Sequence, residues 1–63
     1  MINDDKELAA SLDRIRRLQD QLALLRTAEK NVVNYRLTAI GFISEIDRMQ
    51  LEVREYLSTP AST

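Results

Sequence analysis

Apolar residues in the first half of the chain recur at intervals of three and four positions. They are Leu8, Leu12, Ile15, Leu18, Leu22 and Leu25. This spacing places them on one face of an α-helix and resembles a coiled-coil seam. Asp4 followed by Glu7 is similar to a capping box, and no Gly or Pro occurs between Ile2 and Gly41. The pattern predicts a first helix over about residues 4–29.

The second half carries apolar residues on two opposite helical faces. The broader face holds Tyr35, Ala39, Phe42, Ile43, Ile46, Met49, Val53, Tyr56 and Leu57. The narrower face, which we call the outer stripe, holds Val33, Leu37, Ile40, Ser44 and Leu51. Pro60 disfavours helical geometry at Thr59. We therefore expect a second helix over about residues 32–58 and a disordered tail over residues 59–63.

The two helices are expected to join through a short bend around residues 29–34. Asn31 and Asn34 can each cap a new helix or bend the chain. The alternative is one continuous helix that dimerises as a long coiled coil. The two apolar patterns do not share a heptad frame, because the first seam, continued, would place Arg36 and Asp47 near the core. The phase break favours an all-α, two-helix antiparallel hairpin.

Size argues that this hairpin associates with a second copy. The chain has 63 residues and 7.3 kDa, which allows a single domain over residues 1–63 with a small core. It has no cysteine, so no disulfide can stabilise the monomer. The first helix can cover only the broader face of the second. We therefore predict a homodimer that forms a four-helix bundle with the second helices central.

Charge favours an antiparallel arrangement of the two hairpins. The open end gathers five acidic residues against two basic ones: Asp4, Asp5, Glu7, Glu52 and Glu55 against Lys6 and Arg54. The connection end gathers three basic residues against one acidic one: Arg26, Lys30 and Arg36 against Glu29. Hairpins laid head to tail bring opposite charges together, with a weak effect on orientation.

The predicted surface for self-association, or for binding another partner, lies mainly on the second helix. It consists of Leu24, Val33, Leu37, Ile40, Gly41 and Leu51. Gly41 has two interpretations, since it costs about 1 kcal/mol relative to alanine inside a helix. It permits a close approach by a neighbouring helix, or it is merely tolerated.

The sequence carries no recognisable catalytic chemistry. It lacks histidine, cysteine, a glycine-rich phosphate loop and a metal-binding spacing, so we expect neither an enzyme nor a cofactor. Four acidic residues of the second helix lie on its charged flanks: Glu45, Asp47, Glu52 and Glu55. We interpret them as solvated charges rather than metal ligands.

Arg14, Arg16 and Arg17 form the only basic cluster and are the weak candidate for nucleic-acid contact. Asp13 and Asp20 stand in pairing positions with Arg17 and Arg16, no aromatic residue interleaves, and the net charge is −1. A solvated helix face is the favoured interpretation, and nucleic acid is not an expected partner.

Nothing in the sequence suggests a membrane or secretory protein. No apolar run approaches the length of a membrane span, and Met1 is not followed by a basic region and an apolar core. We therefore expect a cytoplasmic protein.

Two stretches resemble a known family. Residues 1–8 (MINDDKEL), continued by Ser11, Ile15 and Leu18, are similar to the opening of helix-turn-helix antitoxins of the host-inhibition-of-growth type. Glu7 matches the family glutamate, whereas Leu8 replaces its usual tyrosine and Ser11 its usual threonine. Two later segments, residues 45–49 and 52–57, resemble the second helix of that family.

In that family a DNA-binding domain follows the helical hairpin, and this sequence ends before it. The resemblance therefore implies an antitoxin-like helical module whose partner is a small, mRNA-cleaving protein toxin, and it does not imply operator binding. From the residues, the leading hypothesis is a non-enzymatic protein–protein interaction module. A small nucleic-acid-binding protein and a scaffold or assembly subunit remain the alternatives.

Overall fold

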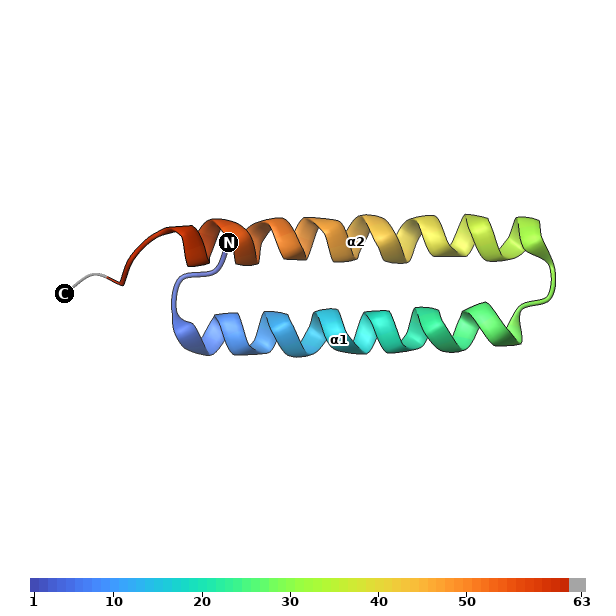
Figure 1. Cartoon of the computed structure of the whole chain (residues 1–63), viewed down its shortest axis with the longest axis horizontal. Coiled ribbons are helices and arrows are strands. Elements are labelled where there is room, and N and C mark those ends of the chain that lie inside the picture. The colour runs from blue at the N-terminus through green and yellow to red at the C-terminus, as the bar shows by residue number, and fades with distance from the viewer. Residues whose placement is uncertain (62–63) are drawn as a thin grey trace.

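The computed structural model describes residues 1–61, which form two antiparallel helices lying side by side (Figure 1). The helices are α1, Asp5–Ala28, and α2, Val32–Ser58. Residues 29–31 connect them at one end of a rod with extents of 52 × 15 × 12 Å. The predicted all-helical hairpin is confirmed, and the single continuous helix is wrong.

The helix limits lie within one residue of the expected ones. Thr59 follows α2 in an extended conformation, and Pro60 and Ala61 continue without helical structure. Residues 62 and 63 of the predicted disordered tail lie outside the described residues.

Each helix begins at a capping side chain of the type that the sequence suggested. Asp4 Oδ1 accepts a hydrogen bond from the backbone N–H of Glu7 at 2.8 Å, which starts α1. Asn31 Oδ1 accepts one from the backbone N–H of Asn34 at 3.0 Å, so Asn31 caps α2. The connection is tightened by the Glu29 carboxylate, which accepts from the backbone N–H of Asn31 at 2.9 Å. The phase break in the apolar pattern thus coincides with a capped turn.

The hydrophobic core is a thin seam between the two helices. Within the two helices, the buried side chains are Ile15 on α1 with Ala39, Ile46 and Met49 on α2. Leu18 and Val53 pack against the cluster that Ile15 forms with Ile46 and Met49. These contacts decide which face of each helix points toward its neighbour.

Three residues that the periodicity assigned to the covered faces remain substantially exposed. They are Leu12, Ile43 and Leu57. A helix packed against one neighbour has only a narrow strip covered. Ile43 lies at the margin of that strip, and Leu57 lies in the last turn of α2, one residue beyond Tyr56, which reaches the first residue of α1. The strip of each helix that its neighbour covers is therefore narrower than the sequence predicted.

Candidate interaction surface

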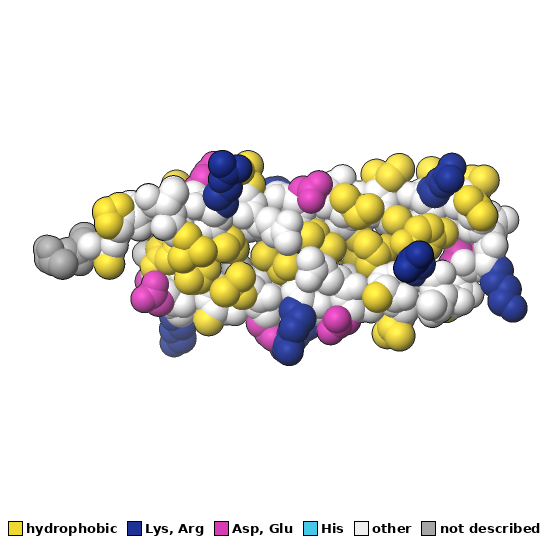
Figure 2. Space-filling model, in the orientation of Figure 1, with side chains coloured by type: hydrophobic (Ala, Val, Ile, Leu, Met, Phe, Trp, Pro, Cys, Tyr) yellow, Lys and Arg dark blue, Asp and Glu magenta, His cyan; other side chains and the backbone are white. Residues whose placement is uncertain are grey.

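The outer stripe is exposed along the length of α2. The exposed fractions are 65% for Val33, 67% for Leu37, 61% for Ile40 and 53% for Leu51. Because the buried residues of α2 face α1, the outer stripe, on the opposite side of the helix, points away from α1. Figure 2 shows hydrophobic side chains along this outer edge, most of them toward the connection end.

Leu24 is also exposed, at 70%, but it does not join this surface. Leu22 and Leu25 are partly buried on the side of α1 that faces α2. Each step along a helix turns the side chain by about 100°, so Leu24 lies on the outward side of α1. The outer stripe and Leu24 therefore face in opposite directions. Of the predicted surface residues, the structure brings those of α2 together and leaves Leu24 apart.

Gly41 lies beside the outer stripe with open space around it. A Cβ placed on Gly41 would meet no atom within 4 Å, apart from its own helix backbone and chain neighbours. No close approach within the hairpin therefore requires this glycine. The open backbone next to Ile40 is accessible to a helix from another molecule.

Charged residues flank the outer stripe on α2. Arg48 donates hydrogen bonds to Glu45 and, at 3.2 Å, to Glu52. The hydrogen bond from Arg48 lowers the pKa of Glu45, and the same bond raises the pKa of Arg48. The Glu45 carboxylate is therefore held as an anion by Arg48. Within residues 1–61, no group of three acidic side chains is placed to hold a metal ion.

The basic cluster of α1, which consists of Arg14, Arg16 and Arg17, does not form a single basic surface. Arg17 and Arg16 both bind Asp13, at 2.8 Å and 3.0 Å. The predicted pairing of Arg16 with Asp20 is wrong, because Arg16 reaches back one turn to the carboxylate that Arg17 also uses. Arg14 lies toward α2, where its charge contributes to the lowered pKa of Glu45.

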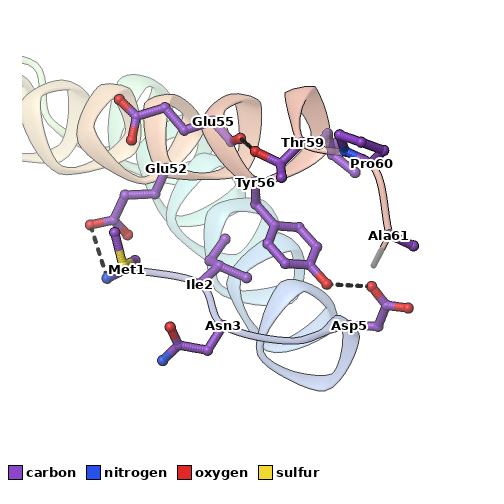
Figure 3. Close-up of a pocket in the computed structure, with 11 residues that line it drawn as sticks. Met1, Ile2, Asn3, Asp5, Glu52, Glu55, Tyr56, Thr59, Pro60 and Ala61 are labelled. Atoms are coloured by element: carbon purple, nitrogen blue, oxygen red, sulfur yellow. Dashed lines mark hydrogen bonds and ion pairs between the residues drawn. The ribbon is translucent and has the colours of Figure 1, made fainter. Parts of the chain in front are cut away.

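The open end of the hairpin contains a cluster that sequence reasoning missed. Ile2 is only 7% exposed, although it precedes the first helix. Figure 3 shows Met1, Ile2 and Asn3 crossing this end beside Glu52 and Tyr56. The terminal amine lies 3.8 Å from Glu52. An apolar residue shortly before a helix cap, as in the hydrophobic staple, was the available signal.

A hydrogen bond between the helices closes the same end. Tyr56 Oη donates to Asp5 Oδ1 at 2.6 Å (Figure 3). This bond, followed by burial and the charges of nearby carboxylates, raises the pKa of Tyr56 to about 12. Tyr56 thus joins the last turn of α2 to the first residue of α1 and fixes how the two helices align.

Comparison with known proteins found no relative of this chain. Neither the protein-family models, nor the curated proteins, nor the solved structures contain a match to this chain. The resemblance to host-inhibition-of-growth antitoxins therefore stays a prediction. Neither α1 nor α2 is long and apolar enough to cross a membrane within the described part of the chain.

Proposed function

We propose that this chain is a protein interaction module that works as a homodimer, with the outer stripe of α2 as the contact surface. The observation that carries the proposal is the exposure of the apolar members of the outer stripe, Val33, Leu37, Ile40 and Leu51, on the side of α2 opposite its core contacts. A helix that is apolar on two opposite faces is typical of a helix covered on both sides.

The exposed area is consistent with one missing partner of the same size. The hairpin exposes 5251 Å². A compact monomer of this mass exposes about 4,200 Å² by the usual scaling with mass. The excess of about 1,000 Å² is close to the roughly 800 Å² that each partner buries in a standard protein–protein interface.

Charge supports a second copy as the partner and an antiparallel arrangement. Five carboxylates and two basic side chains lie at the open end, whereas three basic side chains and one carboxylate lie at the connection end. A parallel dimer would place like ends together. An antiparallel dimer separates the two acidic open ends and places each on the same side as the basic connection end of the other hairpin, which favours this orientation in the encounter.

Two aspartate substitutions of similarly exposed residues test the proposal. Ile40→Asp places a charge in the outer stripe, whereas Leu24→Asp places one on the outward side of α1. We expect Ile40→Asp to be a helical monomer and Leu24→Asp to keep the dimer mass in sedimentation equilibrium. Burial of an unpaired carboxylate at the contact is the reason for the first outcome. An Ile40→Asp protein that keeps the native dimer mass contradicts the proposal.

A further inference from the structure

We propose that the two α2 helices pack antiparallel in one particular register, in which Leu37 lies against the partner's Ile40. This inference rests on the homodimer proposed above and specifies its geometry. In this register the connection-end halves of the two α2 helices overlap, and the open ends point away from each other.

The first support is the pattern of the outer stripe itself. From Val33 to Ser44 its members follow one another at intervals of four, three and four residues, the spacing of a helix–helix seam. When two identical helices pack antiparallel, the numbers of any two residues that face each other add up to the same total, which is 77 for Leu37 and the partner's Ile40. Setting Leu37 against the partner's Ile40 also sets Val33 against the partner's Ser44. Every stripe position of this segment then meets an apolar or small residue.

A register with full overlap of the α2 helices is less favourable. It sets Ile40 against the partner's Leu51, which is an apolar contact. It also sets Leu37 against the partner's Arg54, and Ser44 against the partner's Asp47. Covering a charged group with apolar surface removes water that solvates the charge, and Leu37 offers no compensating hydrogen bond. Beyond Ser44 the outer stripe continues only at Leu51, so extending the overlap adds mainly charged contacts.

Charge at the connection supports the same register. This register brings the partner's Asp47 level with the connection, residues 29–31, which carries Lys30, at both ends of the contact. Lys30 and Asp47 are exposed, and neither takes part in an ion pair within residues 1–61. Two symmetric pairs of opposite charge therefore border the apolar seam. This register also sets Arg36 against the partner's Gly41, where the missing side chain leaves room for the aliphatic part of the arginine.

The direction of the outer stripe also determines the overall arrangement. In a four-helix bundle each helix turns one broad apolar face toward a shared core. Here α2 carries two apolar faces that point in opposite directions, one of them covered by α1. The dimer is therefore a row of four helices, with the two α2 helices inside and the two α1 helices outside.

Disulfide trapping tests the register directly, because the native chain has no cysteine. Mixed Leu37→Cys and Ile40→Cys proteins should form a mixed disulfide dimer faster than mixed Ile40→Cys and Leu51→Cys proteins. The reverse order would overturn the register while leaving the homodimer intact. A native chain that stays monomeric by mass would overturn the homodimer and the register together.

Charge reversal gives a second test that leaves the seam unchanged. Lys30→Glu and Asp47→Lys should each weaken the dimer by about three- to tenfold, since each change affects two exposed pairs. The double variant should recover most of the native affinity, and the control Lys6→Glu, at the open end, should leave it unchanged. A double variant that is no tighter than either single variant would overturn the register.

Discussion

The two faces of α2 have similar residue types and opposite surroundings. On one face Ile46 and Met49 are at most 7% exposed, whereas on the other Leu37 and Ile40 are more than 60% exposed. The difference comes from α1, which lies along the first face only. The inner face therefore holds the hairpin together, and the outer face is available for association. Hydrophobicity alone does not separate these two roles, but direction relative to α1 does.

The same substitution on the two faces should give the largest contrast. Ile46→Asp buries a carboxylate in the core and should destabilise the hairpin by about 4 kcal/mol or more, enough to unfold it. Ile40→Asp should keep the helical circular dichroism of a folded hairpin while losing the dimer. Far-ultraviolet circular dichroism and sedimentation of both variants measure the contrast. If Ile40→Asp also unfolds the chain, the outer face is part of the fold itself.

Loss of the N-terminal cap of α2 should have a smaller effect. Asn31→Ala removes the side chain that accepts from the Asn34 N–H, and it should lower the free energy of unfolding by about 1 kcal/mol. Urea titration followed by circular dichroism measures the loss. Asn34→Ala is the matched control, because Asn34 contributes only its backbone N–H to this cap. Equal losses in the two variants would show that the cap is not formed in solution.

Replacing the glycine beside the outer stripe should stabilise the hairpin rather than destabilise it. In the monomeric Ile40→Asp background, Gly41→Ala should raise the free energy of unfolding by about 0.5–1 kcal/mol, because alanine favours helix and the added Cβ meets no neighbour within the hairpin. Ala23→Gly, at an exposed position of α1, should lower it by a similar amount. A loss of stability on adding Gly41→Ala in this background would contradict the open surroundings of this residue within the hairpin.

The hydrogen bond at the open end predicts a change confined to alkaline pH. In a Tyr35→Phe background, ultraviolet titration should show Tyr56 ionising near its pKa of about 12 rather than near 10.0. The folded state holds this proton more tightly than the unfolded state. Stability is therefore retained below pH 10 and falls between about pH 10 and 12. Asp5→Asn should lower the pH at the midpoint of the Tyr56 titration. An unchanged midpoint would mean that Asp5 does not cause the raised pKa of Tyr56.

The sequence was sufficient to predict most of the fold. Apolar periodicity located both helices, and the small polar residues Asp4 and Asn31 marked their starts. The phase break between the two seams separated a hairpin from one long helix. The opposite directions of the two faces of α2 follow from helical periodicity alone. These features are local, so residue spacing is enough to specify them.

The features that the sequence did not predict depend on how much of one segment is covered by another segment packed against it. Periodicity gives the direction of a side chain on its own helix but not the width of the strip that α1 covers, so Ile43 was expected to be buried. Leu24 is different, because its outward direction follows from the helical repeat once Leu22 and Leu25 are assigned to the side that faces α2. Ile2 lies outside the helical pattern, and its burial depends on how residues 1–3 cross the open end.

The central claim is that a second copy covers the outer stripe, and the mass of the unmodified chain in solution tests it most directly. Sedimentation equilibrium over a range of concentrations should give a mass that rises from that of one 7.3 kDa chain to twice that value and then levels off. A helical protein that keeps the mass of a single chain at every concentration would contradict the claim.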